Sequence, residues 1–134
     1  MRWERETKGL IMSNYLFSKL SYDVIGCAIN VHKTLGFGLP EICYKNALMI
    51  EFADYGINAE SEVQFEVPYK NKLVGYYKAD IVVEHKMILE LKVSDYITPK
   101  HISQLLVYLK LSNIKLGYVF NFGNKILDKQ RLIL

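Results

Sequence analysis

The sequence predicts a single mixed α/β domain, and three observations support this fold class. Helical periodicities and short apolar strands follow one another in the order helix, helix, three strands, helix, strand, strand. The 134 residues are 51% hydrophobic, which is enough for one core. No linker, repeat or block of charge divides the chain, so we expect one domain over residues 15–134, preceded by an N-terminal extension, residues 1–14, that need not be ordered.

Two helices are expected at the start of the domain. Apolar residues recur at helical spacing over residues 21–35, and Gly36 follows as a stop signal. A second helix is expected over residues 39–55, with Pro40 in its first turn and Gly56 as its C-terminal cap. The apolar spacing predicts that this helix buries Leu39, Cys43, Ala47, Ile50 and Ala53.

Three strands, a third helix and two further strands should follow. Alternating residues predict strands over 62–67, 73–83 and 87–93, with a turn at Asn71-Lys72. Thr98 and Pro99 are a hydroxyl cap and a first-turn proline, which begin a helix that continues to residue 112. The last two expected strands are the apolar segments over 115–121 and 125–134.

The most informative segment is the hairpin over residues 78–93, because Asp80, Glu90 and Lys92 interrupt its apolar strands. Burying a carboxylate costs several kcal/mol unless a cation or hydrogen bonds compensate the charge. With a three-residue loop at 84–86, Asp80 opposes Glu90 on the face that also carries Lys92, with Cβ atoms roughly 5 Å apart. A loop with an even number of residues would place the two carboxylates on opposite faces. From the hairpin alone, two interpretations are open: a bound cation that supports a reaction, or a solvated face with a surface Glu–Lys pair.

Polar residues on the expected helices could complete such a site. Glu41 lies in the first turn of its helix, where the dipole favours a carboxylate by about 0.3–1 kcal/mol even without any functional role. Gln104 and Tyr108 are four residues apart, so they share one helix face that could contact a ligand or form an ordinary polar flank. His32 and His101 have no ligand-like spacing, and Mg²⁺ prefers carboxylate oxygen.

Composition excludes several classes of protein. Two cysteines cannot supply the four thiolates of an ordinary iron–sulfur cluster, so no such cluster is expected. No apolar run approaches the roughly 20 residues of a membrane-spanning helix, and no signal-type apolar segment follows the N-terminus. We therefore expect a cytoplasmic protein without a membrane partner. The net charge of +3 is compatible with a polyanion partner but does not require one.

The ordered set of Asp80, Glu90-x-Lys92, an upstream helical Glu41 and a downstream Gln104-x-x-x-Tyr108 resembles the PD-(D/E)XK nuclease superfamily. More specifically, the segment Gly38-Leu-Pro-Glu41-Ile-Cys-Tyr44 is similar to the signature of the GxxExxY proteins. Val31-His32-Lys33 and Asn121-Phe122-Gly123 also resemble that family, and the likeness covers residues 21–131. The proline that names the superfamily motif is absent, since Ala79 precedes Asp80.

The resemblance implies a restriction-endonuclease-like αβββαβ core, with a mixed central sheet flanked by helices, and Mg²⁺- or Mn²⁺-dependent hydrolysis of DNA. It implies that the metal is bound by Asp80, Glu90, the backbone carbonyl of Leu91 and Glu41, the last directly or through water. Lys92 would orient or deprotonate the attacking water and stabilise charge on the phosphate. Gln104 and Tyr108 would position the scissile strand.

Two other classes of function stay open on the sequence. The first is a non-catalytic module that keeps the nuclease fold and binds nucleic acid or a protein. The second is a purely structural or partner-binding protein. DNA is the expected partner under the nuclease hypothesis, and the tyrosine-rich surface of a small chain is compatible with a homodimer.

Overall fold

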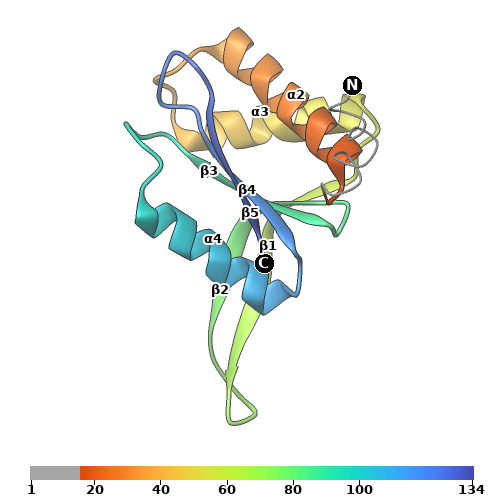
Figure 1. Ribbon diagram of the computed structural model, residues 1–134, viewed down its shortest axis with the longest axis vertical. Helices are drawn as coiled ribbons and strands as arrows, with labels where there is room; N and C mark the ends of the chain where they lie inside the picture. The colour runs from red at the N-terminus through yellow and green to blue at the C-terminus, as the bar shows by residue number, and fades with distance from the viewer. Residues whose placement is uncertain (1–15) are drawn as a thin grey trace, which may run out of the picture.

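The computed structural model describes residues 16–134, in which a five-stranded sheet has helices on both faces (Figure 1). The expected N-terminal extension, residues 1–14, lies outside the described residues. In chain order the elements are α2 (Ser18–Leu35), α3 (Glu41–Asp54), β1 (Ala59–Tyr69), β2 (Lys72–Val83), β3 (Met87–Lys92), α4 (Pro99–Ser112), β4 (Leu116–Asn121) and β5 (Asp128–Ile133). The element order is the one predicted from the sequence.

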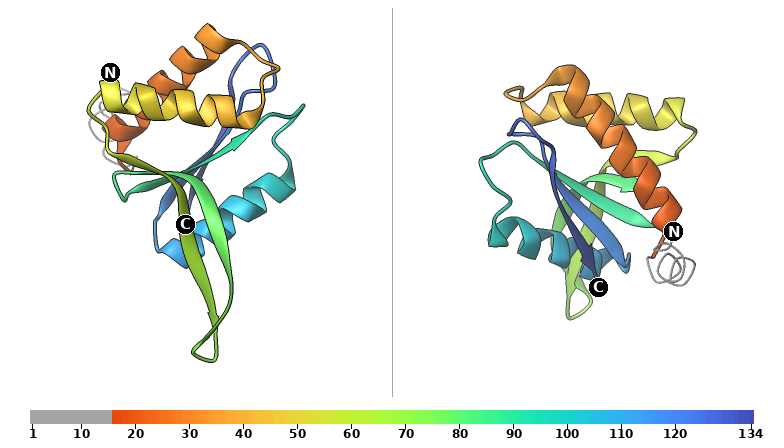
Figure 2. Two further views of the ribbon diagram at one scale, coloured as in Figure 1. Left: turned by 180° about the vertical axis from the view of Figure 1, so that it is seen from behind. Right: turned by 45° about the horizontal axis from the view of Figure 1, so that its top comes forward.

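The strands lie side by side in the order β1-β2-β3-β4-β5. β3 and β4 are parallel, with α4 as the crossover between them, and the other neighbouring strands are antiparallel. α2 and α3 pack on one face of the sheet and α4 on the other, so the sheet separates two apolar clusters (Figure 2). The predicted fold class, a mixed sheet flanked by helices, is confirmed.

The turn between β2 and β3 has the odd length that the sequence argument required. Val83 pairs with Met87 and Ile81 with Leu89, which leaves residues 84–86 as the loop. Glu84 and His85 both adopt left-handed backbone conformations, with φ of 55° and 56°. These two residues therefore supply the conformation that glycine usually provides in three-residue loops.

The buried face of α3 differs from the predicted one. Pro40 is the residue before the helix, with an extended ψ of 151°, and Glu41 is the first helical residue. Leu39 therefore precedes the helix, and Ile50 is 64% exposed. The buried residues are Tyr44, Lys45, Leu48 and Phe52. Apolar residues occur on several sides of α3, so their spacing alone could not select the side on which two aromatic rings are buried.

The start of α4 agrees with the prediction. The Thr98 hydroxyl accepts a hydrogen bond from the backbone N–H of His101 (3.3 Å), and His101 Nδ1 accepts one from the backbone N–H of Thr98 (3.1 Å). This reciprocal cap fixes the helix end and the orientation of the His101 ring.

Across residues 16–134, no helix has the length and apolar character needed to cross a bilayer.

Replacing Gly123 or Gly26 with alanine is expected to change the stability of the fold in opposite directions. A Cβ on Gly123 would lie 2.3 Å from the carbonyl oxygen of Ser94, whereas a Cβ on Gly26 of α2 would meet no atom within 4 Å. The Asn121 side chain hydrogen-bonds both Ser94 and Gly123, so this backbone contact cannot open freely. We expect Gly123→Ala to lower the free energy of unfolding by about 3 kcal/mol. Gly26→Ala, the control, should raise it by about 0.5–1 kcal/mol. Urea denaturation measures both, and similar stabilities for the two variants would contradict the packing described.

Candidate active site

Acidic residues from two strands meet where β2 and β3 part from each other. The pairing of β2 with β3 extends to Ile81 and Leu89, and β3 then continues beside β4 as far as Lys92. Beyond the last pair, side chains link the two strands. The backbone N–H of Asp80 donates to Glu90 Oε2 (3.0 Å), and the N–H of Leu91 donates to Asp80 Oδ2 (2.7 Å). The two carboxylates thus take the place of the next ladder hydrogen bonds.

Glu41 reaches this point because Tyr44, one turn later in α3, fixes the connector that precedes the helix. The Tyr44 hydroxyl donates to the carbonyl of Gly36 (2.7 Å) and accepts from the N–H of Leu39 (3.3 Å). Its ring is fully buried and stacks on Phe122, with centroids 4.5 Å apart. The start of α3 is therefore held in place, and the Glu41 carboxyl shares a hydrogen bond with that of Asp80.

Burial disfavours the ionisation of all three carboxyl groups, and the charge of Asp80 adds to this effect at Glu41 and Glu90. Burial is the main cause that raises the pKa of Glu41 and of Asp80, and the charge of Asp80 adds to the rise at Glu41. Burial, followed by the charge of Asp80, raises the pKa of Glu90 to about 8. Lys92 lowers all three values, because its positive charge favours the ionised carboxylates. The cluster therefore retains protons more readily than separate carboxyl groups would.

Hydrogen bonds connect Lys92 at the end of β3 with two side chains of α4. Lys92 Nζ donates to Gln104 Oε1 (3.1 Å), and Gln104 Nε2 donates to the Tyr108 hydroxyl (3.4 Å). Tyr108 is only 4% exposed, so it is not part of a solvated helix flank. Its hydroxyl accepts the hydrogen bond of Gln104 from the buried side of the helix. The structure thus brings together all six side chains that the sequence singled out: Glu41, Asp80, Glu90, Lys92, Gln104 and Tyr108.

A model of the PD-(D/E)XK nuclease superfamily matches residues 18–132. The chain belongs to this superfamily. The crystal structure of SSO0001 is similar to it with a TM-score of 0.49 and 16% sequence identity, over 82% of this chain and 65% of that one. The chain therefore spans less than two thirds of the length of that structure. No curated protein matches the chain.

The chemistry of the side chains suits a hard divalent cation of the kind that PD-(D/E)XK nucleases generally use. All three acidic side chains offer oxygen, the donor that Mg²⁺ and Mn²⁺ prefer. Across residues 16–134, no three His, Cys, Asp or Glu side chains are arranged as a ready-made metal site. The carboxyls of Glu41 and Glu90 each contact Asp80, so the cluster is linked through Asp80. A cation would offset both the burial and the mutual repulsion of these groups, so they fit such an ion.

Lys45 is a charged neighbour of the candidate site that sequence reasoning missed. It lies one helical turn after Glu41, is 8% exposed, and forms an ion pair with Glu62 of β1. Glu62 has a left-handed backbone (φ 54°) at a gap in the β1–β2 pairing opposite Asp80. The charge of Lys45 lowers the pKa of both Glu41 and Asp80. The four-residue spacing from Glu41 was the available signal, since it places both side chains on one helix face.

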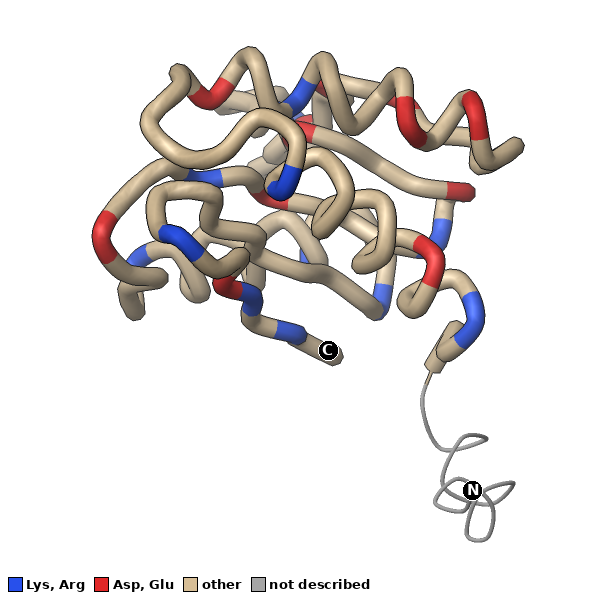
Figure 3. Tube along the Cα trace, turned by 90° about the horizontal axis from the view of Figure 1, so that it is seen from above, with Lys and Arg blue, Asp and Glu red and all other residues tan. Residues whose placement is uncertain are grey.

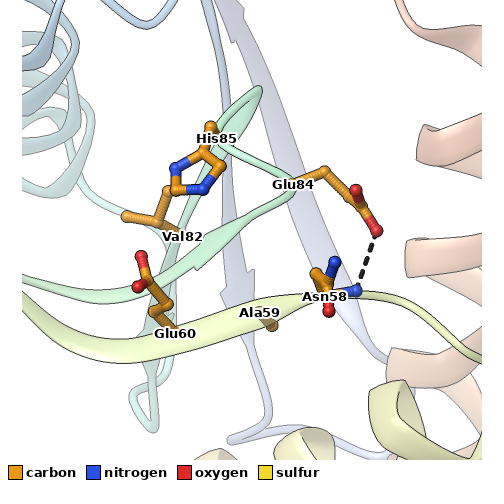
Figure 4. Close-up of a pocket in the computed structure, with 6 residues that line it drawn as sticks. All are labelled: Asn58, Ala59, Glu60, Val82, Glu84 and His85. Atoms are coloured by element: carbon orange, nitrogen blue, oxygen red, sulfur yellow. Dashed lines mark hydrogen bonds between the residues drawn. The ribbon is translucent and has the colours of Figure 1, made fainter.

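Two surface hollows differ in whether residues of the candidate site line them. One, of about 180 Å³, lies at the turn end of the β2–β3 hairpin, where Glu84 accepts a hydrogen bond from the N–H of Asn58 (2.8 Å) (Figure 4). None of the six predicted site residues, all of which lie in the described part of the chain, lines this hollow. The other, of about 550 Å³, is lined by Lys92 and Gln104 and opens from the site itself. The second hollow is therefore the candidate substrate groove.

The raised pKa of Glu90 predicts how stability depends on pH without metal. Because folding raises this pKa from 4.5 to about 8, the folded state binds more protons than the unfolded state between those values. The loss of folding stability caused by burying the ionised Glu90 carboxylate is absent at low pH and grows as pH rises towards 8. The melting temperature of Glu90→Gln minus that of the wild type, measured in EDTA, should therefore increase over this interval. A difference that does not change with pH would contradict the burial of an ionisable Glu90.

Proposed function

We propose that the protein is a nuclease that hydrolyses phosphodiester bonds of DNA with Mg²⁺ or Mn²⁺. The observation that carries the proposal is the meeting of three carboxyl groups of raised pKa with Lys92, where β2 and β3 diverge in a PD-(D/E)XK protein. Asp80 and Glu90, with the carbonyl of Leu91, are the proposed metal ligands. Glu41 would add a carboxylate directly or through water.

The divalent ion, when bound, would supply a more acidic water and neutralise charge on the phosphate. The protein's own contribution is orientation. Hydrogen bonds from the backbone N–H groups of Asp80 and Leu91 fix one oxygen each of Glu90 and Asp80. The carboxylates are therefore held in place before any ligand arrives, which lowers the cost of ordering them.

Lys92 is the proposed group that acts on water and phosphate. Its position two residues after Glu90 places both side chains on the same face of β3. Gln104 holds the Lys92 ammonium in place and is itself held by the buried Tyr108. We propose that Gln104 positions the scissile strand and that Tyr108 acts mainly by fixing Gln104.

Within the superfamily, we propose that the chain is a GxxExxY protein. Three residues at the motif positions have structural roles that support this proposal. Gly38 has a φ of 101°, a conformation that side chains rarely adopt. Glu41 begins α3 and contacts Asp80, and Tyr44 ties the connector to the helix. Together these features place the Glu41 carboxylate in the candidate site, which supports the proposal that the chain is a GxxExxY protein.

One observation favours a second candidate, a nucleic-acid-binding module without catalysis. Asp80 and Glu90 accept hydrogen bonds from backbone N–H groups, so both have a structural task that does not need a metal. A binding module could keep these acids for that reason alone.

A cleavage assay distinguishes the two candidates. End-labelled single-stranded, duplex and branched DNA would be incubated with the protein in Mg²⁺, in Mn²⁺ and in EDTA. Under the nuclease proposal, products appear only with a divalent metal. Tight, salt-sensitive DNA binding without metal-dependent products on any substrate would instead favour the binding module.

A further inference from the structure

The groove of about 550 Å³ lies between Tyr77 of β2 and the first half of α4. Lys92 and Gln104 line it and also belong to the candidate active site, so a strand cleaved at the site would continue into this groove. The remaining lining residues come from α4: Lys100, His101, Ser103 and Val107.

The charge of the groove suits a polyanion. Two lysines line it, and none of its lining residues among the described part of the chain is Asp or Glu. His101 adds a donor, because its Nδ1 accepts from the N–H of Thr98 and leaves the proton of the neutral ring on Nε2. Elsewhere in residues 16–134, acidic and basic residues are spread along the trace and form no single block (Figure 3). The two lysines therefore give this groove a local attraction for phosphate.

Tyr77 gives the groove an aromatic surface. Its ring packs perpendicular to that of the buried Tyr108, with centroids 5.2 Å apart, and 37% of the residue remains exposed. Tyr108 in turn holds Gln104, so the exposed ring stands on a fixed support. The preceding residue, Tyr76, is 59% exposed and points to the opposite side of the strand, since neighbouring side chains alternate.

We propose that this groove binds single-stranded DNA beside the cleaved phosphate, with one unpaired base stacked on Tyr77. The inference rests on the proposed nuclease function and names the form of its substrate. Aromatic rings beside basic side chains are the combination that binds single strands without reading sequence. In a duplex, each base is stacked between its neighbours and offers no free face to a ring on the groove wall. Tyr77 is therefore the residue that selects for unpaired DNA.

Fluorescence anisotropy with a labelled oligo(dT) strand in EDTA, where metal-dependent cleavage cannot occur, tests this proposal. Tyr77→Ala is expected to weaken binding about tenfold, because one stacked base is lost. Tyr77→Phe should bind as the wild type does, since the ring is retained. Tyr76→Ala is the matched control and should change the dissociation constant less than about twofold. A matching duplex should bind more weakly than the single strand and respond to none of the three substitutions.

A second probe changes the DNA and begins with the wild-type protein. A series of strands, each with one abasic site at a different position, would be bound to the wild-type protein in register with a fixed double-stranded end. Loss of affinity at one position, absent in Tyr77→Ala, supports a single stacked base. Uniform affinity along the series, or wild-type binding by Tyr77→Ala, overturns the inference even if metal-dependent cleavage is observed. Tyr77-dependent binding without cleavage of any DNA would instead overturn the nuclease proposal and retain the groove.

Discussion

Replacing Lys92 with methionine is expected to reduce the rate of metal-dependent DNA cleavage about a thousandfold. The Lys92 ammonium contacts the side chain of Gln104 and belongs to the same cluster as the carboxylates. Methionine keeps most of the length and volume of the side chain, so packing between β3 and α4 should survive. Single-turnover cleavage measures the rate, and thermal unfolding of the same preparation checks that the fold is retained.

Lys110→Met is the matched control for this substitution. Lys110 is an exposed residue in the last turn of α4, and replacing it removes the same charge from the surface. The cleavage rate of this variant should stay within a factor of about two of the wild type, because single surface charges act weakly. Cleavage by Lys92→Met within tenfold of the wild type would assign the activity to another group or to a contaminant.

Mn²⁺ or Mg²⁺ is expected to stabilise the wild-type protein by about 2.7 kcal/mol when the free ion is a hundredfold above its dissociation constant. Asp80→Asn should lose this stabilisation together with cleavage. Without metal, however, the variant should melt at a higher temperature than the wild type, because the amide oxygen of the new side chain would still accept from the N–H of Leu91 while repulsion of Glu90 is relieved. Differential scanning fluorimetry across a metal titration measures both effects.

Asp128→Asn serves as the control, since Asp128 is an exposed acid on β5. It should keep the full metal response. The titration is repeated with DNA bound to the Lys92→Met variant, because phosphate oxygens can complete the coordination of Mg²⁺. A melting temperature that does not respond to either metal, with and without DNA, contradicts the metal site.

The central hairpin could be predicted from the sequence because its geometry depends on counting. The three-residue loop and the register from Val83–Met87 to Ile81–Leu89 follow from that count. The predicted pair of Asp80 with Glu90 lies beyond the last paired residues, where hydrogen bonds from the backbone to the two carboxylates link the strands. The helix cap at Thr98 was equally local, since cap and partner are three residues apart. Local rules of this kind depend on neighbours in the sequence, so they need no knowledge of the packed fold.

The contacts that the sequence could not predict all depend on the tertiary fold. Lys45 pairs with Glu62, which lies 17 residues later in the sequence. Glu62 adopts a left-handed backbone conformation, which no propensity favours for glutamate. Tyr77 meets Tyr108 through the packing of α4 on β2. The buried face of α3 was missed for the same reason, because its apolar residues allow more than one buried side.

The hydrogen bonds from the backbone N–H groups of Asp80 and Leu91 to the two carboxylates have a consequence for evolution. If the proposed nuclease function holds, a descendant that lost the activity would still be selected to keep Asp80 and Glu90, because each acid joins β2 to β3. Lys92 contacts only the Gln104 side chain among the hydrogen bonds described for its ammonium, so mutation could remove it without separating the strands. Among relatives of this protein, loss of the lysine beside retained acids would therefore be the signature of a pseudoenzyme.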